Sequence, residues 1–181
     1  MADFTLTSGS YMRIYRTQGA DGASMDFGPE STGQTFVRGS LLELDVDVST
    51  SSHRLAAATV SASTVTSTSL IGVAGEAASS AVDATRIYWR ITPENEFMAR
   101  TRGGLLAQTN VGTAYGLFYD STKAVYGVDL ANTQSTSLRV VVTGLIDAVG
   151  DSGGYVRFKF GLPVGTASTN TFGGGAVPIR Y

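Results

Sequence analysis

The residues best suited to chemistry lie in a few short stretches, and the first is LIGVAGEAASS at residues 70–80. An apolar strand that runs into a glycine turn and a helix start is a common way to hold a phosphate group. Here Gly72 and Gly75 lack the spacing of a dinucleotide-binding fingerprint, and no Lys-Ser or Lys-Thr pair follows them. We therefore interpret these two glycines as the turn after a core strand. Ala77 and Ala78 are small enough for the next layer to pack over them.

Titratable groups that could act in catalysis or metal binding are few. The single histidine, His53, cannot build a histidine-rich metal site, and no Gly-x-Ser-x-Gly motif accompanies it, so we expect an exposed loop histidine. The sequence contains no cysteine, which excludes thiolate nucleophiles and cysteine-ligated metals. We predict no catalytic residue, no cofactor and no bound metal, and therefore a protein that is not an enzyme.

Two groups of carboxylates have residue types that could bind a cation. Glu43, Asp45 and Asp47 alternate along one predicted strand and share its outward face, where carboxylates are normally solvated. The stretch DAVGDSGG at residues 147–154 has some similarity to a calcium loop, but it lacks the terminal glutamate and the alternating ligands of an EF-hand. Neither group changes the prediction of no metal.

Composition favours a β-protein with many turns. Of 181 residues 43% are hydrophobic and only 15% are charged, and there are 22 glycines. The formal net charge of -2 argues against binding nucleic acid, which needs a basic surface. No apolar run approaches the length of a membrane span, and the N-terminus shows no signal peptide, so we expect no membrane association.

Strands with alternating apolar and polar residues must position any site. They are predicted at residues 41–48, 86–92, 114–120, 124–128, 138–145 and 155–160, with turn residues between them. Within the last strand, Val156, Phe158 and Phe160 should point inward. Such short strands at regular spacing predict an all-β fold, a compact β-barrel or sandwich in a single domain.

Three parts of the chain are less regular. Residues 49–69 are rich in serine and threonine and fit either strands or a solvated loop, and residues 76–82 are the best helix candidate. The sole tryptophan, Trp89, is expected to be buried with Ile87, Ile91, Val140 and Val142.

The two ends of the chain are predicted to be extended arms around this core. We place an N-terminal arm at residues 1–34, the β-barrel domain at 35–160 and a C-terminal arm at 161–181. Glycine-rich spacing gives the arms no core of their own, so their apolar side chains are predicted to contact a partner surface or an adjacent subunit. These side chains are Phe4, Leu6, Tyr11, Ile14, Tyr15, Phe172, Ile179 and Tyr181.

Between Thr35 and Phe160 the chain resembles a family of tailed-phage virion proteins that decorate capsids. The resemblance lies in GSLLELD at 39–45, LIGVAGEAAS at 70–79, RIYWRITPENEFMARTRGG at 86–104, NVGTAYGLFYD at 110–120 and SLRVVVTGLIDAVGDSGGYVRFKF at 137–160. It implies a small β-barrel or β-tulip domain on the exterior of an icosahedral head. It also implies the major capsid protein as partner, a homo-oligomer with a trimer favoured, and a role as a cement that stabilises the capsid.

Two alternatives remain open at this point. One is another structural virion protein, such as a tail-tube or head–tail connector subunit. The other is a carbohydrate-binding module, which would need an exposed aromatic platform, for which Tyr88, Tyr115, Tyr119 and Tyr126 are the candidates.

Overall fold

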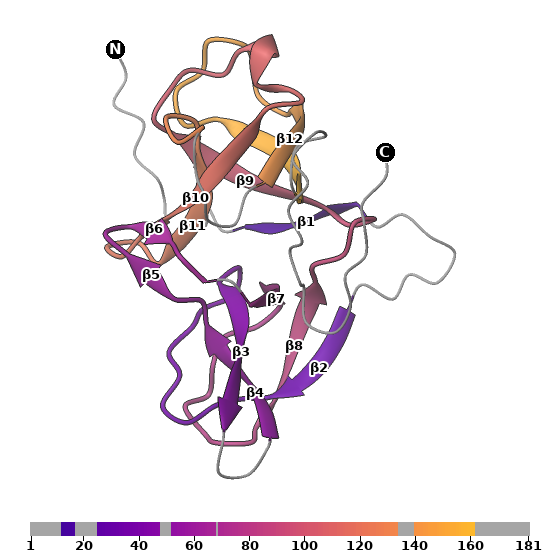
Figure 1. The fold of residues 1–181 in the computed structure, drawn as a ribbon, viewed down its shortest axis with the longest axis vertical. Coiled ribbons are helices and arrows are strands. Elements are labelled where there is room, and N and C mark those ends of the chain that lie inside the picture. The colour runs from indigo at the N-terminus through magenta and orange to yellow at the C-terminus, as the bar shows by residue number, and fades with distance from the viewer. Residues whose placement is uncertain (1–11, 17–24, 48–51, 68, 134–139, 162–181) are drawn as a thin grey trace.

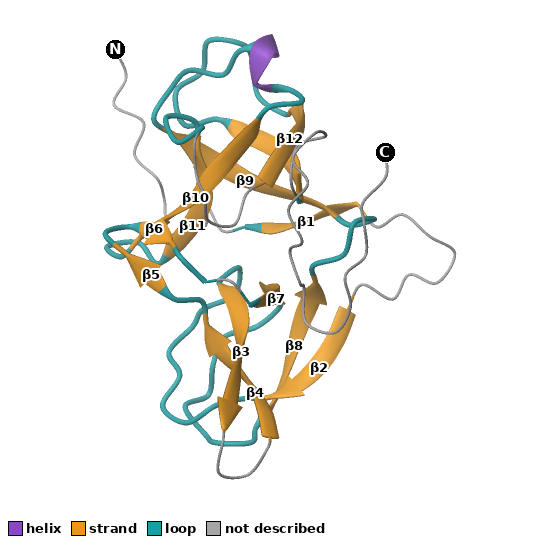
Figure 2. Cartoon of the chain, in the orientation of Figure 1, coloured by secondary structure: helices purple, strands orange, loops and turns teal. Residues whose placement is uncertain are grey.

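The chain folds almost entirely into β-strands (Figure 2). The computed structural model describes residues 12–16, 25–47, 52–67, 69–133 and 140–161. Within these ranges the helical structure is one 3-10 turn, η1 (Gln108–Asn110), and none of it is long and apolar enough to cross a membrane. The all-β prediction is confirmed.

Five strands close into a barrel in the upper part of Figure 1. They are β9 (Glu96–Arg102), β10 (Ala114–Asp120), β11 (Val125–Asp129), β12 (Val140–Leu145) and β13 (Tyr155–Phe160). Around the ring β9 pairs with β13, β13 with β12, β12 with β10 and β10 with β11, all antiparallel. A parallel pair between β11 and β9 closes it. The closure removes the free edges that an open sheet would leave.

Three short strands extend the sheet of the barrel. The strand β1 (Arg13–Arg16) pairs with β9, and β6 (Thr64–Val65) pairs with both β10 and β5 (Val60–Ser61). The serine- and threonine-rich stretch therefore forms strands in its described part, which is one of the two alternatives that its composition left open.

The second sheet lies below the barrel in Figure 1 and has the strand order β2-β8-β7-β3-β4. Its strands are β2 (Met25–Pro29), β8 (Thr85–Arg90), β7 (Leu70–Ala74), β3 (Leu41–Asp47) and β4 (Ser52–Ala57). The sheet curls so that the end of β2 meets β4. Glu30 bridges to Leu55, and the Ser31 N–H donates to the Leu55 carbonyl at 2.9 Å.

Two apolar cores result, and β3 contributes to both. Leu41 lies in the barrel core, and its neighbour Leu42 lies in the smaller core enclosed by the second sheet. The barrel core is centred on Phe97, Phe158 and other side chains with no exposed surface. The prediction that Val156, Phe158 and Phe160 point inward is confirmed.

The strand β7 corrects the interpretation of Gly72. This glycine lies inside the strand rather than in a turn, and the ring of Tyr88 packs directly over it. A Cβ atom at position 72 would lie 2.4 Å from Cδ2 of Tyr88, so only glycine fits without a shift. Gly75 follows the strand as expected, but Ala77 is exposed, and residues 76–82 form an irregular loop instead of the helix.

Trp89 is half-buried rather than fully buried. It packs against the barrel core that contains Val140 and Val142, as does Ile91. The strand β8 lies between two cores, because Tyr88, the residue before Trp89, belongs to the core of the second sheet. A strand with apolar contacts on both sides does not follow the alternation that a half-buried strand shows.

Parts of the predicted N-terminal arm take part in both sheets. Met12 is buried in the barrel core, β1 pairs with β9, and β2 pairs with β8. Glu30 is fully buried as well. Because β1 and β2 pair with strands of the same chain, their backbone groups form hydrogen bonds without a partner protein.

Candidate interaction surface

The strongest candidate for a functional surface is an apolar tip at the end of the barrel that carries η1. We define the apolar tip as Leu105, Ile146 and Val149. Leu105 is 61% exposed and Val149 is 64% exposed, the highest values among the large apolar side chains that the structure describes, and Ile146 is 39% exposed. Exposed apolar side chains that gather on neighbouring loops usually mark an interface.

Backbone hydrogen bonds hold the two loops of the apolar tip together. The Leu106 N–H donates to the Asp151 carbonyl at 2.9 Å, and the Gly150 N–H donates to the Leu106 carbonyl at 2.8 Å. The Leu106 side chain is buried and anchors its loop in the barrel core. A surface that is already ordered loses little conformational entropy when it binds.

The carboxylates of residues 147–154 accept hydrogen bonds from the backbone of this loop. Asp147 accepts a hydrogen bond from the Tyr155 N–H at 2.9 Å, and Asp151 accepts one from the Ala148 N–H at 3.1 Å. Among the residues described by the structure, no group of three His, Cys, Asp or Glu side chains is arranged to hold a metal ion. Asp147 and Asp151 thus act as turn-stabilising residues of the kind expected for aspartate.

The acidic residues of β3 also have neighbours within the protein. Glu43 accepts hydrogen bonds from the N–H and the hydroxyl of Thr59 at 3.1 and 2.8 Å. Asp45 accepts one from the Ser31 hydroxyl at 2.6 Å. The side chain of Asp47 lies outside the described residues. His53 is exposed as expected, although it lies in strand β4 instead of a loop.

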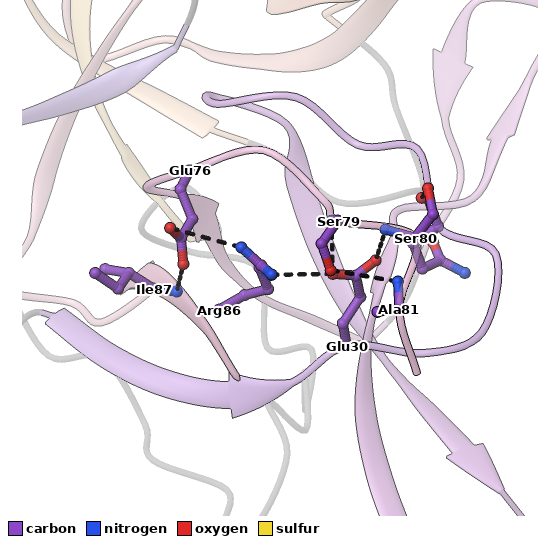
Figure 3. Close-up of polar contacts among 8 residues, drawn as sticks. Glu30, Glu76, Ser79, Ser80, Ala81, Arg86 and Ile87 are labelled. Carbon is purple, nitrogen blue, oxygen red and sulfur yellow. Dashed lines mark hydrogen bonds and ion pairs between the residues drawn. The ribbon is translucent and has the colours of Figure 1, made fainter. Parts of the chain in front are cut away.

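A buried carboxylate that the sequence analysis missed is the centre of the polar network in Figure 3. Glu30 has no exposed surface and accepts hydrogen bonds from the N–H groups of Ser79 and Ser80 at 2.8 and 2.7 Å. The Ser79 hydroxyl donates at 3.1 Å, and the guanidinium of Arg86 donates at 3.0 Å. Arg86 in turn lies 3.7 Å from the carboxylate of Glu76.

Glu30 is held in its charged form. Burial alone would raise the pKa of its carboxyl group, but the hydrogen bonds from Ser79 and Ser80 and the charge of Arg86 outweigh burial, and the pKa is lowered. A carboxylate with no exposed surface is not accessible to a substrate. Its role is to fix the loop between β7 and β8 onto the end of β2.

An aromatic platform for carbohydrate is not formed by the four candidate tyrosines. Tyr88, Tyr115 and Tyr126 are 8%, 4% and 3% exposed, and only Tyr119 is partly accessible. Tyr119 and Tyr126 pack against each other with ring centroids 4.6 Å apart. The carbohydrate-binding alternative loses the feature on which it depended.

Few of the predicted arm contacts can be placed. Tyr15 in β1 is 46% exposed and lies beneath the guanidinium of Arg157, which is 5.2 Å from the ring centroid. Ile14 is paired with Phe97 in the sheet. The other predicted contacts lie outside the described residues: Phe4, Leu6, Tyr11, Phe172, Ile179 and Tyr181.

The chain was compared with known protein families, curated proteins and solved structures. No family model matches the chain, and no curated protein or solved structure is similar to it.

Proposed function

We propose that this protein is a structural virion protein that decorates the exterior of an icosahedral phage capsid and bridges neighbouring capsomers. The observation that carries the proposal is the apolar tip, a preordered surface of Leu105, Ile146 and Val149 with no covering side chain in the described part of the chain. The capsid context rests on the resemblance of residues 35–160 to phage decoration proteins. The major capsid protein is the proposed partner, and a trimer is the proposed oligomeric state.

The mechanism of stabilisation is mass action. A subunit that binds the assembled shell, and not its dissociated parts, stabilises the shell by the free energy of binding. Burying one valine or leucine side chain fully contributes about 1.5–3 kcal/mol. Many symmetric copies then multiply a modest contact through avidity. Such a mechanism needs a stable scaffold and an accessible apolar surface rather than a catalytic site.

The test uses purified heads from which this protein has been removed. The wild-type protein should rebind them, and a Leu105→Ser/Val149→Ser variant should bind at least about tenfold more weakly. Full burial of such a side chain contributes about 1.5–3 kcal/mol, these two are only 61% and 64% exposed before binding, and tenfold corresponds to about 1.4 kcal/mol. Co-sedimentation with heads measures occupancy. Thermal melts of wild type and variant should coincide, because both side chains are exposed.

Val82→Ser is the matched control. Val82 is also an exposed apolar residue, at 49%, but it lies in the loop between β7 and β8, away from the apolar tip. This control should bind like wild type. Equal binding by the tip variant would exclude the apolar tip as the attachment surface. Wild-type protein that does not bind heads, or labels only the tail in electron micrographs, would overturn the decoration role itself.

A further inference from the structure

A second apolar surface lies on the outer side of the curled sheet. We define the β2–β8 face as Met25, Phe27, Ile87 and Trp89. Met25 is opposite Trp89 and Phe27 is opposite Ile87 in the antiparallel pair, and residues that are directly opposite lie on the same face. Met25 is 44% exposed and Phe27 is 57% exposed, while Ile87 and Trp89 are half-buried. Trp89 joins this face to the barrel core, against which it also packs.

The free edge of β2 is poorly suited to accept another strand. The N–H and carbonyl of Ile87 are engaged on the opposite side of β8, by Glu76 and Gly75, so the backbone of Phe27 points away from β8. The Phe27 N–H is already held by its neighbour Asp26 at 2.8 Å, and Pro29 has no N–H. Blocked donors of this kind protect an edge from strand addition. A ligand of this surface must therefore bind through its side chains.

The chain leaves the barrel close to this face. Phe158 pairs with Phe97, so the end of β13 lies beside the loop that joins β8 to β9. In that loop the Asn95 side chain donates to the Arg90 carbonyl at 2.8 Å, one residue from Trp89. The residues after Gly161 thus start beside the loop that follows Trp89 and the end of β8.

The C-terminal sequence matches this face in character and in length. Its last residues, AVPIRY at 176–181, alternate so that Val177, Ile179 and Tyr181 share one side when extended. Val177 follows Gly161 by 16 residues, and an extended residue spans up to about 3.3–3.6 Å, so the segment can reach along the whole of β2. Pro178 removes a backbone donor, in keeping with contact through side chains.

We propose that the C-terminal segment docks on the β2–β8 face of its own chain, with Val177, Ile179 and Tyr181 covering Met25, Phe27 and Trp89. A site on the same chain is favoured because the short connection gives a high effective concentration. The assignment goes beyond the capsid role and does not depend on it. It replaces an external partner with an internal one for the predicted C-terminal arm.

Trp89 is the only tryptophan of the chain, so tryptophan fluorescence measures how far the β2–β8 face is shielded from water. In the full-length chain, an Ile179→Ser/Tyr181→Ser variant should shift tryptophan emission to longer wavelength and increase quenching by acrylamide. Phe27→Ser should produce the same two changes and should fold, because Phe27 is exposed. Val82→Ser should leave both readouts at the wild-type value. Unchanged emission and quenching in the two C-terminal substitutions would overturn the proposal.

Cross-linking separates docking within a chain from exchange between chains. Because the sequence has no cysteine, a Phe27→Cys/Ile179→Cys variant has only one disulfide to form within a chain. Under mild oxidation we expect a monomer of increased mobility on a denaturing gel, and much less of it from a Val82→Cys/Ile179→Cys control. Covalent dimers as the main product would overturn docking on the same chain.

Discussion

Replacing Glu30 by glutamine should strongly destabilise the protein. The substitution keeps the size of the side chain but removes the charge that four donor groups surround at 2.7–3.1 Å. Removing one partner of a buried ion pair typically costs 3–5 kcal/mol. Glutamine retains one acceptor oxygen, and Arg86 retains Glu76, so we expect the lower end of that range, about 3 kcal/mol.

Thermal and urea unfolding measure this loss. For a chain of this size 1 kcal/mol corresponds to about 2–4 °C, so the melting temperature should fall by about 6–12 °C. Glu94→Gln is the matched control, since Glu94 is exposed in the loop before β9, and it should change stability by less than about 0.5 kcal/mol. Equal stability of the two variants would refute the argument that Glu30 fixes the loop between β7 and β8 to β2.

Three further predictions concern the fold. Because the pKa of Glu30 is lowered in the folded state, its contribution to the free energy of unfolding is present above the usual pKa of 4.5 and is lost as pH falls towards the folded pKa. Wild type should therefore lose stability on acidification below about pH 4.5 more steeply than Glu30→Gln. Parallel plots of stability against pH for the two proteins would argue against a charged Glu30. Gly72→Ala should cost about 1–3 kcal/mol in urea unfolding because its Cβ would overlap Tyr88, whereas Gly104→Ala, where the nearest atom is 3.4 Å away, should be nearly neutral. Deleting residues 1–33 removes β1, β2 and Glu30 and should abolish cooperative unfolding, while deleting residues 1–11 should preserve it. If circular dichroism shows that a fragment of residues 34–181 is folded, the two sheets are stable without these strands.

The sequence was sufficient where one face of a strand meets one core. In β13 the alternation of Val156, Phe158 and Phe160 predicted burial correctly, because the other face of that strand is polar. In β3 the face predicted to point outward, that of Glu43 and Asp45, also carries Leu41. Leu41 is buried because a second core lies on that side of the strand, which the alternation alone does not indicate.

The polar and apolar sites were harder to predict for a different reason. Glu30 is separated from Ser79 and Arg86 by 49 and 56 residues, and nothing local marks a glutamate whose partners are so distant. Leu105 and Val149 are apolar residues in loops, and residue type alone predicts that leucine and valine are buried rather than exposed. The turn residues around Asp147 and Asp151 were visible, but their carboxylates bind backbone N–H groups that only the folded loop brings within reach.

The adjacent leucines of β3 bear on how the molecule responds to force. Leu41 and Leu42 anchor a single strand in two cores on opposite sides, so pulling either half away must extract one of them into water. Separation of the two halves under load therefore exposes an apolar side chain in addition to breaking backbone hydrogen bonds, which couples the halves mechanically. In the proposed capsid role, this coupling would let the protein carry load between capsomers without its two halves separating.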